Sequence, residues 1–167
     1  MALEIYWGSG SPFAWRVLLA LEVKQLSYES KLLSLSNAEH KSDEFLAISP
    51  RGKVPAIRDG DVTVHESIAI IQYIDDIKPE PVIFGNTPAE RSQVWSAIME
   101  TMNYIEPHIV DFARPIFFGY LEKKQASVTK ARQAIEEELS NIDQTLSSKD
   151  YLVSDQLTAA DIVMYPI

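Results

Sequence analysis

The sequence predicts an α/β N-terminal domain of βαβ-ββα order followed by an all-α helical domain. Short apolar strand patterns alternate with helical ones through residues 1–78, and strand patterns end there. Three of the nine prolines fall within residues 79–88, together with a glycine and an asparagine, which is typical of a linker. Residues 89–167 then show long amphipathic helical patterns. We therefore place one domain on each side of the linker.

The overall composition is that of a globular protein with an acidic surface. The chain carries 24 acidic and 15 basic side chains, a net charge of −9, and is 46% hydrophobic. This charge repels phosphate backbones and anionic lipid, so we expect neither nucleic acid nor a membrane surface as a partner. Without a basic leader or a span-length apolar run, a cytoplasmic protein is expected. The absence of Cys excludes a disulfide, a thiolate metal site and a nucleophilic thiol from the chain itself.

The first elements form a strand, helix, strand unit. Residues 3–7 are an apolar strand, and two glycines end it. Ser11 then has the position of an N-cap and Pro12 that of the first helical residue, which together are a strong signal for a helix start. The helical pattern extends to about Lys24, and residues 28–33 read as the next strand. Two strands joined through a helix are expected to pair in parallel.

Antiparallel strands and a helix complete this half. The polar stretch 34–49 reads as a loop with a helical turn at 43–47. Residues 54–58 and 62–64 flank an Asp-Gly-Asp turn and predict a hairpin. Isoleucines at three-residue spacing predict a helix with one buried face over residues 66–77.

The second half is expected to be helical throughout. Long amphipathic helices are predicted from residue 89 to about residue 119 and over residues 128–146, and a third begins near Thr158. Pro107 and Pro115 are expected to kink or interrupt the first of these helices, because proline removes a backbone donor.

Four short motifs carry chemical information. They are Ser-Pro-Phe-Ala-Trp-Arg-Val at 11–17, Gly-Lys-Val-Pro at 52–55, His-Glu-Ser-Ile-Ala-Ile at 65–70 and Thr-Ala-Ala-Asp at 158–161. In this order and spacing the chain resembles the cytosolic glutathione S-transferase family, in its serine-type classes (theta-like, zeta-like or bacterial), over residues 3–167. The first motif is similar to the Ser-x-x-x-x-Arg-Val turn of the zeta class and to Cys-Pro-Phe-Ala of the omega class. The resemblance implies a thioredoxin-like first domain that binds glutathione as co-substrate.

The resemblance implies that Ser11 is the catalytic residue, acting on the thiol of glutathione. A thiol with a pKa of about 8.5 is mostly protonated at neutral pH, and lowering that pKa by about 2 units requires about 2.7 kcal/mol of thiolate stabilisation. A hydroxyl and free amides at a helix start can supply part of it, assisted by the helix dipole. Ser11 would then stabilise the nucleophile rather than be one. A simple helix cap is the alternative for Ser11, and Tyr6 and Ser9 are the alternative thiolate stabilisers.

The other motifs imply the rest of a glutathione site. Glu66 and Ser67, at a helix start, offer a carboxylate, a hydroxyl and amides to the γ-glutamyl group. Lys53 and His40 are candidates for the glycyl carboxylate, and the main chain of Val54 would bind the cysteinyl portion as an added strand would. The resemblance also implies a cis peptide before Pro55. The complete set of glutathione-binding candidates is Phe13, His40, Lys53, Val54, Pro55, Glu66 and Ser67.

A stripe in the helical half is a candidate pocket for the electrophile. Tyr104, His108 and Phe112 recur every four residues after Glu100, which places them on one helix face if the helix continues through Pro107. A core or dimer-interface stripe is the alternative explanation. No second metal ligand lies at suitable spacing from His108, so no metal is expected. Thr158 and Asp161, which resemble the capping box of the family's central helix, are expected to be structural.

These features predict a glutathione transferase that activates the thiol of glutathione for attack on an electrophilic small molecule. Serine at position 11 disfavours thiol transfer, for which omega-type members use a cysteine there. The alternatives are a non-catalytic glutathione-transferase-like interaction or regulatory module and a glutathione-dependent isomerase. The family usually forms two-fold dimers, so a homodimer is expected. The chain ends at Ile167, a few residues into the helix that the family buries centrally, so we expect a C-terminal truncation relative to the family.

Overall fold

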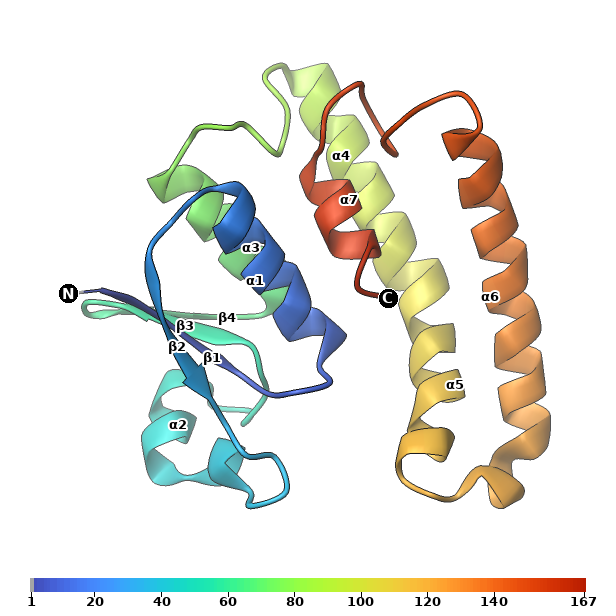
Figure 1. The fold of residues 1–167 in the computed structure, drawn as a ribbon, viewed down its shortest axis with the longest axis horizontal. Coiled ribbons are helices and arrows are strands. Elements are labelled where there is room, and N and C mark those ends of the chain that lie inside the picture. The colour runs from blue at the N-terminus through green and yellow to red at the C-terminus, as the bar shows by residue number, and fades with distance from the viewer. Residues whose placement is uncertain (1) are drawn as a thin grey trace. The chain divides into compact units, whose positions relative to one another are not determined.

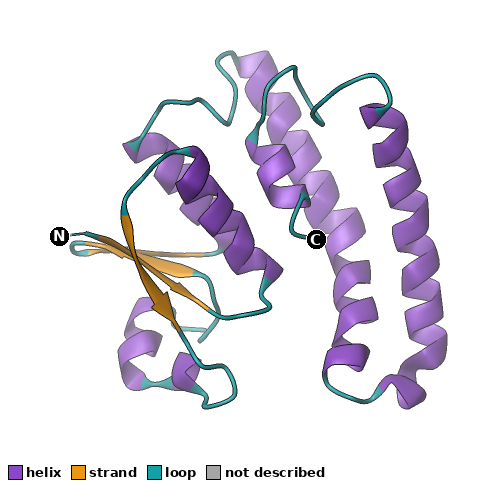
Figure 2. Ribbon diagram, in the orientation of Figure 1, coloured by secondary structure: helices purple, strands orange, loops and turns teal. Residues whose placement is uncertain are grey.

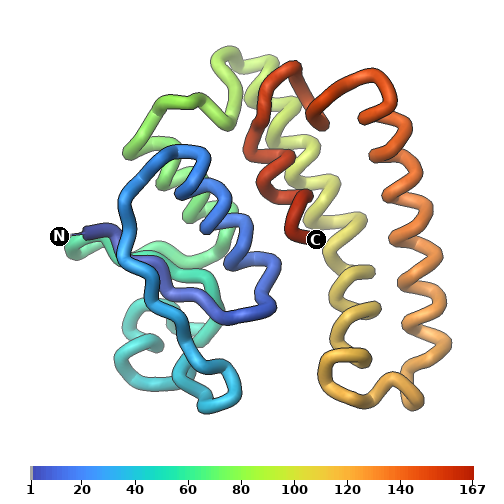
Figure 3. Tube along the Cα trace, viewed as in Figure 1, coloured from blue at the N-terminus to red at the C-terminus, as the bar shows by residue number. Residues whose placement is uncertain are grey.

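The computed structural model describes residues 2–167 and divides into two units. The first extends through Phe84, and the second runs from Gly85 to Tyr165. Figure 1 traces the elements in chain order, and Figure 3 shows the same path as a tube. The first unit combines a sheet with helices and the second contains helices, as the colours of Figure 2 show. The predicted α/β fold followed by an all-α unit is confirmed.

The sheet of the first unit has four strands in the order β2-β1-β3-β4. The strands are β1 (Leu3–Trp7), β2 (Tyr28–Leu32), β3 (Ala56–Asp59) and β4 (Val62–His65). β1 pairs in parallel with β2, with Leu3 opposite Tyr28, and antiparallel with β3, with Ile5 opposite Ile57. β3 and β4 form the antiparallel hairpin. The parallel crossover unit and the hairpin are both confirmed.

Helices lie on both faces of this sheet. α1 (Pro12–Val23) and α3 (Ser67–Ile77) pack against each other on one face, and α2 (Asp43–Ile48) lies on the other (Figure 2). Successive side chains of a strand point to opposite faces, so Ile5 and Tyr6 of β1 serve different layers. Ile5 is fully buried, and the Tyr6 ring lies 5.8 Å from that of Phe45 in α2. The sheet therefore has an apolar core on both sides.

Lys24 binds both α3 and the segment that follows it, residues 79–84. Its side chain is completely buried at the end of α1 and forms an ion pair with Asp75 of α3. It also donates hydrogen bonds to the carbonyl oxygens of Pro79, at 3.2 Å, and Pro81. Ile83 and Phe84 are buried as well. Residues 79–84, expected to belong to a linker, thus pack with the first unit, because the carbonyl oxygens of Pro79 and Pro81 join the Asp75 carboxylate in binding one buried ammonium group.

The predicted first helix of the second unit forms three consecutive segments. α4 (Pro88–Glu100) opens with a capping box, in which the backbone N–H of Glu90 donates to Thr87 Oγ1 at 3.1 Å. A π-helical turn (η2, Thr101–Ile105) follows, and α5 (Glu106–Phe117) continues the path with Pro107 in its first turn. The predicted interruption at Pro107 is confirmed as a π-turn, which often accompanies local disruption of the hydrogen-bond ladder. Pro115 lies two residues before the end of α5.

The remaining helices pack on these segments. α6 (Gln125–Leu146) begins three residues earlier than predicted and packs along α5. α7 (Ala159–Met164) packs against α4. The carboxylate of Asp161 accepts hydrogen bonds from the backbone N–H and the hydroxyl of Thr158, both at 2.8 Å, and from the N–H of Leu152 at 2.8 Å. The predicted structural role of Thr158 and Asp161 is confirmed.

Short 3-10 turns precede two of the helices. A 3-10 turn (η1, Glu39–Lys41) precedes α2, and another (η3, Leu121–Lys124) precedes α6. None of the helices within residues 2–167 combines the length and the apolar character needed to cross a bilayer.

Candidate functional site

Strand pairing brings four connections to one edge of the sheet. β1 and β2 run in the same direction, and β3 runs opposite to both β1 and β4. The ends of β1, β2 and β4 therefore lie at the same edge as the beginning of β3. Most of the predicted glutathione-site residues adjoin this edge. Ser11 and Phe13 follow β1, Lys53, Val54 and Pro55 precede β3, and Glu66 and Ser67 follow β4.

Ser11 is the N-cap of α1, as predicted. Its Oγ accepts a hydrogen bond from the backbone N–H of Ala14 at 3.3 Å, and its backbone is extended at φ −89°. A hydroxyl that accepts one bond still has its own proton to donate. Pro12 has no backbone N–H, and the amide of Phe13 lies in the first turn, where an α-helix offers no internal acceptor. A donor hydroxyl and a helix start thus coincide at half-buried Ser11.

The two alternative thiolate stabilisers have different surroundings. The Tyr6 hydroxyl donates to Glu4 Oε2 at 2.9 Å, and its side chain is 7% exposed within the cluster formed with Phe45 and Ile48. Burial, and then the hydrogen bond to Glu4, raises the pKa of Tyr6 to about 12. This phenol proton is therefore engaged inside the first unit. Ser9 is exposed and lines the cavity described below.

The loop before β3 is fixed by two side chains that sequence reasoning missed. Ser49 is buried, and its hydroxyl donates to the carbonyl of Lys53 at 2.9 Å and accepts from the N–H of Lys53 at 3.3 Å. Lys41 Nζ donates to the carbonyls of Arg51 and Gly52, each at 3.2 Å. Neither residue type predicts this role, because Ser49 binds backbone atoms four residues away and Lys41 binds backbone atoms ten and eleven residues away.

The peptide between Val54 and Pro55 is cis, which confirms the conformation that the family resemblance implied. Pro55 is buried, and Val54 packs against the apolar cluster that contains Tyr6 and Phe45. Lys53 immediately before them is exposed. The turn therefore places the long, exposed cationic side chain of Lys53 next to a backbone segment that packing holds in place.

Glu66 has an unusual backbone. It precedes α3 with φ 72° and ψ 117°, and its side chain is exposed. Non-glycine residues rarely adopt a positive φ, because such a conformation costs about 1–3 kcal/mol and persists only where the surroundings impose it. Ser67 follows as the first residue of α3 and is 8% exposed. An outward carboxylate and a helix start are thus adjacent, as the motif predicted.

Two further predicted residues lie on or beside these connections. His40 is in the 3-10 turn after β2, and its Nδ1 is buried without a hydrogen-bond partner among the described residues. Phe13 is half-buried in the first turn of α1, with the guanidinium of buried Arg16 at 5.2 Å from its ring centroid. Arg16 was recognised only as part of a motif, and the structure places it against Phe13.

The stripe predicted in the helical unit is divided by the π-turn. Tyr104 lies in η2 and is 60% exposed, whereas His108 and Phe112 lie in α5 and are half-buried. The three residues therefore lie in two consecutive helical segments, and their common face stays a prediction. Across residues 2–167, no three His, Asp or Glu side chains are grouped so that they could hold a metal ion.

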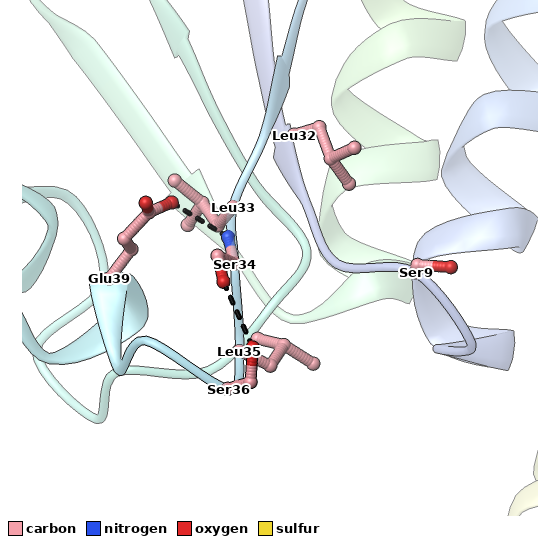
Figure 4. Close-up of a pocket in the computed structure, with 7 residues that line it drawn as sticks. All are labelled: Ser9, Leu32, Leu33, Ser34, Leu35, Ser36 and Glu39. Atoms are coloured by element: carbon pink, nitrogen blue, oxygen red, sulfur yellow. Dashed lines mark hydrogen bonds between the residues drawn. The ribbon is translucent and has the colours of Figure 1, made fainter.

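An open cavity of about 500 Å³ lies beyond the end of β2. Figure 4 shows its lining residues, with Ser9 and Glu39 at opposite ends of the set and the side chains of Leu32 and Leu35 extending toward the side of Ser9. The lining residues are Ser9, Leu32, Leu33, Ser34, Leu35, Ser36 and Glu39. Sequence reasoning did not identify this cavity, since residues 34–49 were interpreted as a polar loop.

Comparison with protein-family models matches both units. Residues 10–77 match the model "Glutathione S-transferase, N-terminal domain", and residues 105–167 match "Glutathione S-transferase, C-terminal domain". The first match contains three of the four sequence motifs, and the second contains the fourth.

Curated relatives and solved structures agree with these matches. Glutathione S-transferase Z2 of Arabidopsis thaliana is 33% identical over 99% of this chain and 74% of its own length. A "Probable maleylacetoacetate isomerase" of Vibrio cholerae is 30% identical over 96% of this chain and 76% of its own length. The crystal structure of a glutathione S-transferase from the clam Laternula elliptica is 33% identical, with a TM-score of 0.86 over 99% of this chain and 76% of that one.

Proposed function

The chain belongs to the glutathione S-transferase family, and we propose that it binds glutathione at the sheet edge of its first unit and uses Ser11 to activate the thiol. The enzyme is a glutathione transferase that acts on an electrophilic small molecule. The observation that carries the proposal is the meeting of Ser11, the cis Val54–Pro55 turn and the Glu66–Ser67 helix start at one edge. A structural neighbour of 29% identity and TM-score 0.87, a glutathione transferase from Phanerochaete chrysosporium, was crystallised with oxidized glutathione.

In the proposed reaction Ser11 remains chemically unchanged. The Ser11 hydroxyl donates a hydrogen bond to the sulfur, and the start of α1 adds its dipole, so the thiol releases its proton to solvent at neutral pH. The thiolate electron pair attacks the electrophilic carbon and forms a C–S bond. In a displacement, the bond to the leaving group breaks and that group departs with its electron pair. In an addition, the electron pair moves onto the acceptor and water supplies a proton.

Glutathione would be held at its three charged groups. Glu66 would pair with the γ-glutamyl ammonium, and the start of α3 with Ser67 would bind the adjacent carboxylate. Lys53 and His40 would meet the glycyl carboxylate, with Phe13 beside the Ser11 turn. The backbone N–H and C=O of Val54 would pair with the cysteinyl residue as an extra strand.

Three wider assignments belong to the same proposal. We infer a homodimer, because the family typically assembles as two-fold dimers, and a cytoplasmic location. Tyr104, His108 and Phe112 of the second unit are proposed to contact the electrophile.

Calorimetric titration with glutathione tests the binding half of the proposal. Wild-type protein should bind saturably, and Glu66→Ala should weaken binding at least tenfold because an ion pair to the ligand ammonium is lost. Asp61→Ala is the matched control, since Asp61 is an exposed acid at the opposite end of β4. Absence of binding by folded wild-type protein would contradict the proposal and favour a non-catalytic interaction module.

A glutathione-dependent isomerase is the second candidate. The observation that favours it is the 30% identity to the Vibrio cholerae protein described as a probable maleylacetoacetate isomerase. The two functions differ in the fate of glutathione, because an isomerase regenerates it whereas a conjugating transferase consumes it. Measuring free thiol over many turnovers, with an alkyl halide and with a cis-enone acid as separate substrates, therefore distinguishes them.

A further inference from the structure

We propose that the connection between α5 and α6 docks the protein onto an anionic phospholipid surface. The segment is residues 114–130, the α5–α6 tip, where the two helices that lie side by side are joined at one end (Figure 1). It belongs to the second unit alone and contains none of the residues assigned to glutathione. The inference therefore stands or falls independently of the proposed function.

Large apolar side chains are exposed together at the α5–α6 tip. Phe117 is 82% exposed and Phe118 is 73% exposed, and Ile116 and Leu121 beside them are 47% and 41% exposed. Single exposed apolar residues are ordinary, whereas several that adjoin one another mark a surface that a partner covers.

The backbone at the end of α5 is regular and closed. The N–H of Gly119 donates to the carbonyl of Ile116 at 3.3 Å, and the N–H of Tyr120 donates to the carbonyl of Pro115 at 3.0 Å. With φ +70° at Gly119, these two bonds form the Schellman pattern that ends a helix. The two phenylalanines, which are the last helical residue and the C-cap, thus project from an ordered helix end.

The charge of the α5–α6 tip is opposite to that of the whole chain. The tip contains Arg114, Lys123, Lys124 and Lys130 but only one acid, Glu122, which gives a local charge of +3 in a chain of −9. All five side chains are exposed. The ion pairs found among the described residues involve other side chains, so these cations are available to an external anion.

Screening makes this local charge decisive. The expectation against a membrane surface followed from the net charge, but at physiological salt a charge acts over only about 8 Å. The nearest acid on α5, Asp111, lies six residues before Phe117, about 9 Å along the helix axis. The first acid of α6, Glu136, lies eleven residues after its start, about 16 Å along that axis. An anionic surface that meets the tip is therefore attracted by its cations more than it is repelled by these acids.

Two of the lysines lie where a helix disfavours them. Lys123 and Lys124 immediately precede α6, whose start has neither a side-chain cap nor an acidic residue in its first turn. The positive end of the helix dipole raises the free energy of a cation there. Such a local conflict is typical of a residue with another role, and anionic headgroups beside the lysines would relieve it.

The combination of side chains favours lipid over a protein partner. Aromatic rings are enriched at the headgroup level of membranes, and clustered basic side chains bind anionic lipid. Lysine is depleted in protein–protein interfaces. We therefore infer that the two phenylalanine rings enter the headgroup region while the surrounding cations face the lipid charge.

Co-sedimentation of the full chain with lipid vesicles tests the proposal. Wild-type protein should bind vesicles of phosphatidylcholine with about one-third phosphatidylserine at least tenfold more tightly than vesicles of phosphatidylcholine alone, because each basic side chain near the anionic surface strengthens binding about fivefold. Raising the salt concentration should weaken the binding to the anionic vesicles.

Paired variants assign the binding to the α5–α6 tip. Phe117→Ser should weaken it at least fivefold through lost apolar burial, whereas Tyr165→Ser, at a side chain 83% exposed after α7, should leave it unchanged. Lys124→Glu should weaken it at least tenfold, since two units of charge change. Lys149→Glu is its control, because Lys149 is exposed beyond the other end of α6, and it should change binding less than twofold.

The far-UV circular dichroism of each variant verifies that it is folded, which the exposure of all four substituted side chains leads us to expect. Failure of folded wild-type protein to bind anionic vesicles would overturn the proposal, as would equal effects of the two variants in either pair. Self-association without vesicles that Phe117→Ser abolishes, together with no vesicle binding, would also overturn it and would assign the tip to a contact between copies of the chain.

Discussion

The buried ammonium of Lys24 forms an ion pair with the carboxylate of Asp75, 51 residues further along the chain. Lys24 has no solvent exposure, and its remaining donors bind the carbonyls of Pro79 and Pro81. Asp75 Oδ1 also accepts from the N–H of Ile83 at 3.4 Å. One cation thus ties together the end of α1, the end of α3 and the segment that leaves the first unit. Its removal would leave the partly buried Asp75 carboxylate without its cationic partner.

Lys24→Met is therefore expected to destabilise the protein by about 3–5 kcal/mol, since it leaves a carboxylate uncompensated in the interior. The free energy of urea unfolding measures this. Lys31→Met is the matched control, because Lys31 pairs with Glu29 and Glu4 near the surface, where an ion pair contributes about 0–1 kcal/mol. Equal losses for the two variants would show that the buried network has no special role in stability.

The Tyr6–Glu4 hydrogen bond predicts a loss of stability at alkaline pH. The pKa of Tyr6 is raised to about 12 by burial and by Glu4, so the folded state retains the phenol proton more tightly than the unfolded chain does. This contribution is complete below about pH 10 and is lost as the pH rises toward about 12, and a two-unit shift corresponds to about 2–3 kcal/mol. Unfolding free energies of wild-type protein and Tyr6→Phe, measured at several alkaline pH values, should therefore converge.

The ion pair between Glu4 and Arg58 predicts a loss of stability at acidic pH. The Arg58 guanidinium, which donates to Glu4 Oε2 at 2.5 Å, holds the pKa of Glu4 below its usual value. Stability from Glu4 is thus present above its unfolded pKa and is lost as the pH falls through the lower folded value. Glu4→Gln should therefore reduce the fall in the free energy of unfolding that wild-type protein shows at acidic pH. If the fall is unchanged in that variant, other carboxylates cause it.

Local signals explain why much of the fold could be predicted from the sequence. Ser11 followed by Pro12 marks the start of α1 through capping chemistry that needs no distant partner, and Thr158 with Asp161 marks α7 in the same way. The hairpin turn around Gly60 is equally local. Each of these depends on side chains and backbone atoms within a few residues.

Features that depend on distant partners were not predictable. The Lys24–Asp75 pair joins residues from two helices, and Lys41 acts on a loop ten residues away. The positive φ of Glu66 has no signal in its residue type. The π-turn before Pro107 was anticipated only as an interruption, because its hydrogen-bond geometry depends on packing.

Gly52 supports the turn that precedes Lys53 and Val54. Its φ is +57°, and an added Cβ would lie 2.6 Å from the carbonyl oxygen of His40. Gly52→Ala should lower the free energy of unfolding by about 1–2 kcal/mol, because alanine is strained in the left-handed conformation, and by about 1 kcal/mol more because of the clash. It should also weaken glutathione binding. Gly60→Ala isolates the backbone effect, because Gly60 has φ +60° and nothing within 4 Å of its Cβ position. Equal unfolding free energies for the two variants would contradict the steric argument.

Ser11→Ala separates catalysis from helix capping. Loss of the proposed donor to sulfur should lower turnover about 10²–10³-fold and raise the pKa of bound glutathione toward that of the free thiol, measured by thiolate absorbance across a pH series. The substitution also removes a helix cap, which lowers the free energy of unfolding by about 1 kcal/mol.

Ser42→Ala is the matched control, because Ser42 caps α2 by accepting a hydrogen bond of the same length, 3.3 Å, from the backbone N–H of Phe45 and lies outside the proposed site. Ser42→Ala should show the stability loss with unchanged turnover. If both variants kept full turnover, Ser11 would be a cap only, and the sulfur donor would have to be sought among other groups at this sheet edge.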